Sequence, residues 1–479
     1  MDWIHGFNFL AVSLVVCALL IGRLRRRLER KRRQLKAFED EESRMFDYLH
    51  DLGEAISKES GQIGLYRVIV EGVNRVVGSR GGAVYLLDET GEFLQPKHLS
   101  ENCPQLVGVP HEVLRRAEKD PRALDSHLRL AQQPADQGVI GSVLKSGQPE
   151  FIHDLKNHGS FGEYHDGFGG GKVCALLAPL RHGGKDLGVL AVARHSDEPP
   201  FSPNDFTVFR SAAEQSAFAL GNALLYREAA EKRQIESDLR SASEVQRILL
   251  PQGDPIIPGY RVAGANLPAR IISGDYYDHL KLANGCHGVV IADVSGKGVA
   301  AGLMMAMCRS VLRAEGDSSD DPGEVLAIVN RQLFPDMRED MFISLFYGVI
   351  DPDNGNIRLV RAGHEAALCY RSASGTIEKI RPPGLALGID EGSAFERVTR
   401  PVDLEMSSGD CLLFYTDGVK EAIDVNEQEF GMERLEKTFL DAAPLGAEAV
   451  LGAIQREVRA FVGEFRQMDD ITLLVLERR

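Results

Sequence analysis

The stretch GVVIADVSGKG (residues 288–298) combines the pattern of a buried strand with an acidic residue at its end. Its apolar part predicts a core strand that ends near Asp293, and a glycine-containing turn follows. The next residues, GVAAGLMMAMCRSVL (298–312), predict a helix rich in small side chains. An aspartate placed between a strand and a glycine turn can point into a cleft that backbone carbonyls also approach. The stretch therefore predicts an α/β domain with a polar site at a strand end.

Three further segments place acidic residues beside apolar strands. The same order of apolar strand, aspartate and glycine occurs in CLLFYTDGV (411–419), with Asp417. The order is reversed in MDDITLLVL (468–476), where the acids precede the strand. The third segment is SGDYYD (273–278), which carries Asp275. A single aspartate of this kind is as often a turn former or a helix cap. Four sets of acids beside core strands would repel one another unless they were paired or metal-bound. Together they predict a site for divalent cations that prefer oxygen ligands.

Residues 242–477 strongly resemble the PPM family of type 2C phosphatases, in its bacterial sporulation-E branch. The resemblance implies a metal-dependent protein serine/threonine phosphatase built as an α/β/β/α sandwich, with two central sheets, helices outside them and metals between them. The first metal motif reads SGD rather than the commoner GGD, which leaves Asp275 in place. The motifs that carry the resemblance are ASEVQRILLPQ, MMAMCRSVLRA, MFISLFYGVID, RLVRAGHEAALCY, PPGLALGI, FYTDGV, EFGMERL and DDITLLVL.

The resemblance also implies a role for each member of the metal site. Asp293 would bridge two Mn²⁺ or Mg²⁺ ions, and the carbonyl of Val294 would bind the second ion. Asp417 and Asp469 would complete the shell of the first ion. Asp275 would contact the second ion directly or through water. These four aspartates are the predicted catalytic residues.

Asp470 is the alternative to Asp469, because the two are adjacent and the family pattern is ambiguous by one position. The implied mechanism needs no protein nucleophile, because two cations lower the pKa of a bridging water and neutralise phosphoryl oxygens during in-line attack. His364 is a candidate general acid, although a structural role in the sheet is favoured. No arginine can be assigned to phosphate binding. By analogy with the branch, the expected substrate is phosphoserine or phosphothreonine on an anti-anti-sigma (STAS) protein.

The segment before the phosphatase, residues 50–225, alternates between strand and helix patterns. AVYLLD (83–88) before the turn ETGE predicts a strand that enters a hairpin, and the apolar runs of 173–194, divided by HGGK, predict a second hairpin. Ser202 and Pro203 predict the start of a helix, since serine caps helices and proline fits the first helical position. Pro251 marks the predicted end of the following helix.

Residues 49–226 resemble a GAF domain, an antiparallel sheet with flanking helices. The resemblance rests on QGVIGSVLKSGQPEFIHDL (137–155), the hairpin APLRHGGKDLGVLAV and the closing helix FSPNDF…ALGNALL. Such domains bind cyclic nucleotides, tetrapyrroles, haem or only another chain, and the cyclic-nucleotide signature is not evident, so the ligand is unknown. Candidate ligand residues, for which plain packing or solvation is favoured, are Cys103, Cys174, His153, His158, His165 and His182.

The N-terminus combines an apolar run with a basic one. Residues 7–22 carry no charge, and residues 23–36 hold nine basic side chains. Because positive charge stays on the cytoplasmic side, the order predicts an uncleaved single-pass anchor of the cytoplasmic membrane, with all later domains in the cytoplasm. A cleaved signal peptide and an interfacial helix are the less favoured alternatives.

The composition of the chain argues against some classes of partner and of metal site. The 479 residues carry a net charge of -15, which argues against nucleic acid as a partner. The seven cysteines lack zinc-site or disulfide spacing, which favours reduced thiols.

The predicted domains are an anchor (1–23), a charged helical linker (24–49), a GAF domain (50–225), a helical coiled-coil linker (226–252) and the phosphatase (253–479). Small residues recur seven apart along the helix before Pro251, in the two series Ala212, Ala219, Tyr226 and Ser216, Ala223, Ala230. This spacing suits a parallel pair of helices, and hence a homodimer, as well as it suits a helix packed on its own GAF domain. Two other functions remain open: an inactive scaffold that binds a phosphoprotein, and a receptor whose main function lies in its GAF domain.

Overall fold

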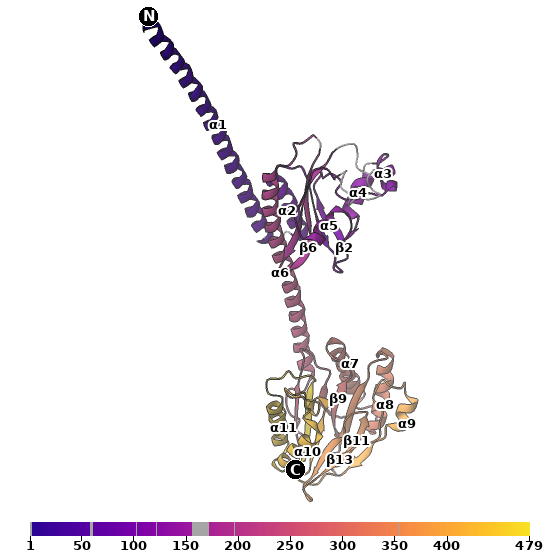
Figure 1. The fold of residues 1–479 in the computed structure, drawn as a ribbon. Helices are drawn as coiled ribbons and strands as arrows, with labels where there is room; N and C mark the ends of the chain where they lie inside the picture. Colours follow the sequence, from indigo (N-terminus) through magenta and orange to yellow (C-terminus); the bar gives the residue numbers. More distant parts are fainter. Residues whose placement is uncertain are drawn as a thin grey trace. The chain divides into compact units, whose positions relative to one another are not determined.

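The computed structural model describes the backbone of residues 2–57, 61–101, 103–120, 122–155, 172–195, 197–353 and 355–479. The chain divides into two compact units, Met1–Glu231 and Lys232–Arg479 (Figure 1). The structure thus divides the chain within the predicted helical linker. The predicted ligand candidates His158 and His165 lie outside the described residues.

The N-terminal unit is built on one antiparallel sheet with the strand order β3-β2-β1-β6-β5-β4. Its elements are α1 (Asp2–Ser57), α2 (Gly61–Val77), β1 (Gly81–Leu87), β2 (Phe93–Leu99), α3 (His111–Ala117), α4 (Arg122–Leu130), β3 (Gln133–Pro134), α5 (Gly138–Ser146), β4 (Glu150–Ile152), β5 (Cys174–His182), β6 (Lys185–Arg194) and α6 (Pro203–Leu249). One core joins α2, the first part of α6 and one face of the sheet, and a second core joins α5 and the other face.

Local sequence signals set the boundaries of this unit. Both predicted hairpins are confirmed, as β1–β2 and as β5–β6, where His182 pairs with Lys185 across two glycines with positive φ. Ser202 Oγ accepts a hydrogen bond from the backbone N–H of Asp205, and the Asp205 carboxylate accepts one from the N–H of Ser202. This reciprocal cap fixes the start of α6 at Pro203, as predicted. The helix ends at Leu249, two residues before Pro251.

The long helix α1 contains the predicted anchor at its N-terminal end. Among the residues with described side chains, which begin at Arg23, no helix is long and apolar enough to cross a lipid bilayer. The predicted anchor, residues 1–23, lies almost wholly outside them.

The small residues of α6 face their own domain in the first part of the helix. Ala212, Ser216 and Ala219 are buried, and Ser216 hydrogen-bonds to the hydroxyl of Tyr48 at 2.6 Å. Tyr226, in contrast, is 72% exposed. For these three small residues the packed-helix interpretation therefore describes the structure.

The C-terminal unit has two five-stranded antiparallel sheets, with the orders β14-β11-β10-β9-β8 and β13-β12-β15-β16-β7. Its elements are β7 (Tyr260–Leu267), β8 (Tyr276–Lys281), β9 (His287–Val294), α7 (Val299–Glu315), α8 (Pro322–Leu333), β10 (Ile343–Ile350), β11 (Ile357–Ala362), β12 (Ala367–Arg371), β13 (Thr376–Ile380), α9 (Ser393–Val398), β14 (Val402–Leu404), β15 (Cys411–Tyr415), α10 (Gly431–Ala442), α11 (Ala447–Val462) and β16 (Ile471–Arg478).

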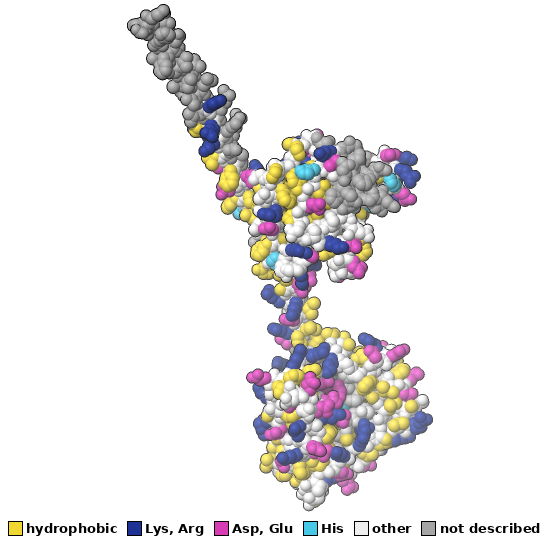
Figure 2. All heavy atoms as spheres, in the orientation of Figure 1, with side chains coloured by type: hydrophobic (Ala, Val, Ile, Leu, Met, Phe, Trp, Pro, Cys, Tyr) yellow, Lys and Arg dark blue, Asp and Glu magenta, His cyan; other side chains and the backbone are white. Residues whose placement is uncertain are grey.

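The sheets stack face to face and helices cover their outer faces (Figure 1). Ile291 and Phe346 of the first sheet share a core with Phe414 and Leu474 of the second. Helices α7 and α8 pack outside the first sheet, and α10 and α11 outside the second. This is the predicted α/β/β/α sandwich. Figure 2 shows acidic side chains gathered on one face of the unit.

Candidate metal and phosphate site

Strand direction brings the predicted aspartates together at one edge of the sandwich. In the first sheet, β9 ends at Val294 while its antiparallel neighbour β8 begins at Tyr276, directly after Asp275. Tyr276 pairs with Ala292, which places Asp275 beside Asp293. In the second sheet, β15 ends two residues before Asp417, and its neighbour β16 begins directly after the pair of aspartates at 469 and 470. Each sheet therefore contributes two acidic strand ends to the same edge.

Asp275 links the two sheets. It is 2% exposed, and its Oδ2 accepts hydrogen bonds from Thr416 Oγ1 at 2.8 Å and Thr472 Oγ1 at 2.6 Å. Both threonines belong to the second sheet, at the end of β15 and within β16. Sequence reasoning missed them because threonine is an ordinary strand residue. They hold a buried carboxylate in position at the junction of the sheets.

Asp469 and Asp470 point to different places. Asp470 accepts hydrogen bonds from Ala269 N at 2.7 Å, Ser273 Oγ at 2.8 Å and Gly274 N at 2.8 Å. It therefore anchors the loop that carries Asp275. Asp469 instead lines a cavity of about 230 Å³. The geometry favours Asp469 as the ligand and gives Asp470 a supporting role.

Most of the residues predicted to form the metal site line this cavity. Three of its lining residues are predicted ligands, and a fourth supplies the predicted carbonyl. The lining is formed by Asp293, Val294, Ser295, Gly296, Lys297, Phe342, Ser344, Gly363, His364, Glu365, Asp417 and Asp469. Asp275 lies behind Asp293 and is not part of the lining.

Burial and neighbouring negative charges raise the pKa values of three aspartates in the site. Burial, with added repulsion from Asp417 and Asp469, raises the pKa of Asp293 to about 7. Burial and the charge of Asp293 raise the pKa of Asp275 well above its usual range, against the opposing effect of its two threonine donors. Burial also raises the pKa of Asp417, and nearby Glu421 adds to this effect. The site therefore favours any species that brings positive charge.

The donor set fits hard divalent cations, which bind carboxylate and carbonyl oxygens. Asp293, Val294, Asp417 and Asp469, which carry such oxygens, all line one cavity. Within the described residues, however, no three acidic, histidine or cysteine side chains are already arranged closely enough to hold a metal ion.

His364 lies in the cavity wall as a neutral side chain. It is buried, its Nδ1 hydrogen-bonds to Ser344 Oγ at 2.7 Å, and its Nε2 has no hydrogen-bond partner among the described residues. Burial lowers the pKa of His364 to about 4. An imidazolium general acid is therefore absent at neutral pH, which agrees with the favoured structural role.

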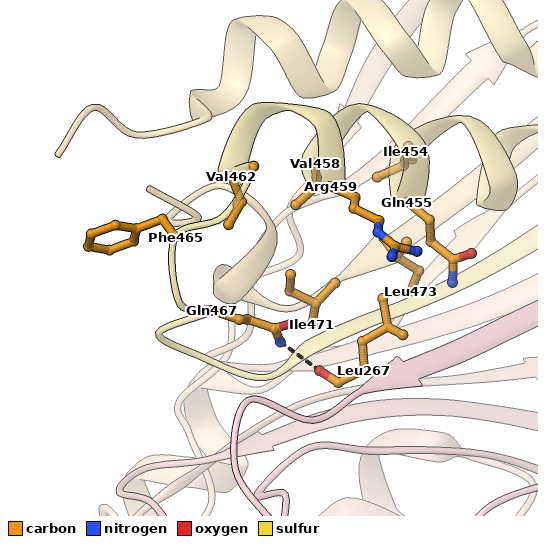
Figure 3. Close-up of a pocket in the computed structure, with 11 residues that line it drawn as sticks. Leu267, Ile454, Gln455, Val458, Arg459, Val462, Phe465, Gln467, Ile471 and Leu473 are labelled. Atoms are coloured by element: carbon orange, nitrogen blue, oxygen red, sulfur yellow. Dashed lines mark hydrogen bonds between the residues drawn. The ribbon is translucent and has the colours of Figure 1, made fainter. Parts of the chain in front are cut away.

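A second, apolar pocket of about 370 Å³ lies between α11 and strands β7 and β16 (Figure 3). Gln467, at its rim, donates hydrogen bonds to the carbonyls of Leu267 at 2.8 Å and Asp469 at 2.7 Å. This amide ties the segment before β16 to β7, and so helps to place Asp469.

Two antiparallel sheets stacked between helices, with an acidic site at their edge, define a PP2C-type phosphatase domain. Residues 283–479 match the family described as stage II sporulation protein E, and residues 63–221 match the GAF domain family. The chain therefore contains a SpoIIE-type phosphatase domain over residues 283–479 and a GAF domain over residues 63–221, as the sequence predicted.

Curated relatives agree with these matches. Protein IcfG of Synechocystis is 30% identical over 269 residues, which are 50% of this chain and 41% of IcfG. Phosphoserine phosphatase RsbU of Bacillus subtilis is 28% identical over 293 residues, 58% of this chain and 82% of RsbU. The chain thus spans about two fifths of IcfG and most of RsbU.

A solved structure, the SiaA-PP2C domain of Pseudomonas aeruginosa, is 21% identical with a TM-score of 0.44, and covers 52% of this chain and 99% of that domain.

We expect Asp293→Asn to stabilise the metal-free protein. Since the pKa of Asp293 is raised from 3.8 to about 7, the folded state binds a proton more tightly than the unfolded state in that interval, and stability falls as pH rises through it. The substitution should add on the order of 2 kcal/mol at pH 8 and less at pH 5. Urea unfolding with a chelator at both pH values measures this, with exposed Asp403→Asn as the control. Equal effects at both pH values would contradict the prediction.

We expect Gly418→Ala to disrupt the site. A Cβ at this position would lie 2.0 Å from the carbonyl oxygen of Asp470 and 3.3 Å from the Cβ of Asp469. The strands that carry Asp417 and Asp469 would have to separate, at a cost of about 1–3 kcal/mol. Calorimetric Mn²⁺ affinity and urea unfolding should both decline. Gly253→Ala, where the added Cβ meets nothing within 4 Å, is the control and should change neither.

Proposed function

We propose that the chain hydrolyses phosphoserine or phosphothreonine on a partner protein, using two Mn²⁺ or Mg²⁺ ions held by Asp275, Asp293, Asp417 and Asp469. One observation carries the proposal: acidic strand ends from both sheets converge at one edge, where burial and neighbouring negative charges raise the pKa values of Asp275, Asp293 and Asp417. Homology to the phosphoserine phosphatase RsbU supports the same reaction. An inactive scaffold is the alternative, and the complete set of four aspartates argues against it.

Different residues of the chain would have different roles in the reaction. Bound divalent cations supply Lewis acidity, which lowers the pKa of water and neutralises phosphoryl charge. Asp293 lies centrally in the acidic cluster and Val294 offers its carbonyl from the same strand end. Thr416 and Thr472 fix Asp275 by hydrogen bonds. These fixed oxygens orient the reacting groups before reaction, which is the main contribution of a protein to phosphoryl transfer.

We further propose that the GAF domain regulates the phosphatase through α6. Near the end of this helix, Gln246 donates from Nε2 to the carbonyl of Ser273 at 2.6 Å and accepts from the N–H of Ser273 at 3.0 Å. Ser273 lies two residues before Asp275. A change in the position of α6 would therefore reach the site directly, whatever the GAF ligand is.

Dimerisation through the later part of α6 is the proposed route for such a change. Tyr226, Ile235, Val245 and Ile248 are each more than 60% exposed on this helix. Apolar side chains that remain exposed along a helix favour pairing with a second copy.

We also propose which class of protein carries the phosphorylated residue. On the resemblance to the sporulation-E branch alone, we propose a STAS-type anti-anti-sigma protein as the phosphoprotein partner.

Membrane anchoring is proposed from the order of apolar residues 7–22 and basic residues 23–36. The GAF and phosphatase domains would then lie on the cytoplasmic face.

We expect the full-length chain to hydrolyse a chromogenic phosphate ester and a phosphoserine protein only with Mn²⁺ or Mg²⁺. Asp293→Asn should lower kcat by at least about a thousandfold, because it removes a carboxylate that would hold the cations. Circular dichroism must show the variant folded, and Asp403→Asn should keep full activity. Near-normal metal-dependent turnover in Asp293→Asn would overturn the assigned site. Absence of turnover in the folded wild type, with Mn²⁺ bound, would favour the scaffold.

We expect the full-length chain to sediment with membranes and to resist extraction by alkaline carbonate, which leaves integral anchors in place. A chain of residues 24–479 should remain in the supernatant at low and high salt. If the shorter chain also binds membranes and salt releases it, the basic residues rather than an anchor carry the attachment. Full extraction of the full-length chain would contradict the anchor.

A further inference from the structure

Lys297 occupies a turn that directs it into the acidic cavity. It lies between the end of β9 and the start of α7, and its neighbours Gly296 and Gly298 have φ values of 91° and 82°. Such positive φ values suit glycine, so the two glycines permit a tight turn. The turn places Lys297 among the residues that line the cavity.

The ammonium group of Lys297 is held by the segment before β16. Its Nζ lies 2.7 Å from Asp469 Oδ2 and donates to the carbonyl of Met468 at 2.9 Å. The other oxygen of Asp469 accepts a hydrogen bond from the N–H of Asp470 at 2.9 Å. Both oxygens of this predicted ligand are therefore engaged, one of them by a positive charge.

Lys297 is also the one lysine or arginine in the lining of this cavity, all of whose residues are described. No arginine is part of the lining, and the nearby Lys420 is held outside it by Glu365 at 3.1 Å. A lysine ammonium binds phosphate oxygens as a compact charge. Helix α7 begins two residues later, so the positive end of its dipole adds to the same region.

We infer that Lys297 has two successive partners: Asp469 in the metal-free protein, and the phosphoryl oxygens of the substrate once a cation has engaged Asp469. This inference rests on the proposed function. A cation at Asp469 would neutralise the charge that holds Lys297, and the side chain, 39% exposed, has freedom to turn toward the substrate. Lys297 is thus a substrate-binding residue that also balances charge before metal binding.

A purely orienting role for Lys297 makes the opposite prediction about metal affinity. If the ion pair only positions Asp469 for the metal, removal of the ammonium weakens metal binding. If Lys297 competes with the cation, its removal leaves metal binding as tight or tighter, because the cation no longer displaces a bound positive charge.

The test compares Lys297→Met with the wild type in the full-length chain. Calorimetry measures Mn²⁺ binding without phosphate, and then binding of inorganic phosphate to the Mn²⁺-loaded protein. We expect the Mn²⁺ dissociation constant to stay the same or fall, and the phosphate dissociation constant to rise about tenfold or more. Lys297→Arg, which keeps the charge, should recover most of the phosphate affinity.

Lys379→Met is the matched control, because Lys379 pairs with Glu436 at 2.6 Å and is not part of the cavity lining. It should change neither constant. A Mn²⁺ dissociation constant that rises more than about threefold in Lys297→Met, or an unchanged phosphate dissociation constant, overturns the inference. Both readouts are independent of turnover, so a wild type that binds Mn²⁺ but hydrolyses nothing would refute the proposed function and still decide the role of Lys297.

Discussion

Repulsion among buried carboxylates is the constraint around which the phosphatase domain is organised. Asp275, Asp293, Asp417 and Asp469 come from both sheets, and burial together with nearby negative charge raises the pKa values of the first three. Such an arrangement lowers the stability of the metal-free fold above neutral pH. It persists because the two stacked sheets fix the strand ends, and because hydroxyl and backbone donors hold individual carboxylates. The stability of the sandwich core offsets the electrostatic cost of the site.

The fold was largely predictable because its signals are local. Glycine-containing turns, ETGE and HGGK, indicated both hairpins. Ser202 and Pro203 marked the start of α6, and four acidic strand ends indicated one edge of a sandwich. The pairing of sheets was not readable from periodicity, because buried strands look alike whichever neighbour they have. It came from the family resemblance, and the topology agrees with it.

The sequence was sufficient to predict the aspartates of the site, but not the residues that hold those aspartates in position. Thr416 and Thr472 resemble any strand threonine until the fold brings them to Asp275. Lys297 resembles a solvated turn lysine, although its position between two glycines in SGKG was a signal that its backbone is constrained. The ligand of the GAF domain stays unpredicted: Cys174 is buried, and burial raises the pKa of Cys103 to about 12, so the Cys103 thiol is not activated in the structure.

The two adjacent aspartates before β16 show that the site depends on the exact position of each residue in this segment. Asp469 faces the cavity, whereas Asp470 binds the loop of Asp275. The two residues are chemically identical, yet neither can replace the other, because a shift of one residue would exchange the carboxylate that lines the cavity for the one that anchors the loop. Insertion or deletion of a single residue between α11 and β16 would therefore be far more harmful than many substitutions there. The length of this connection is therefore constrained as strongly as the identity of Gln467, Asp469 and Asp470 within it.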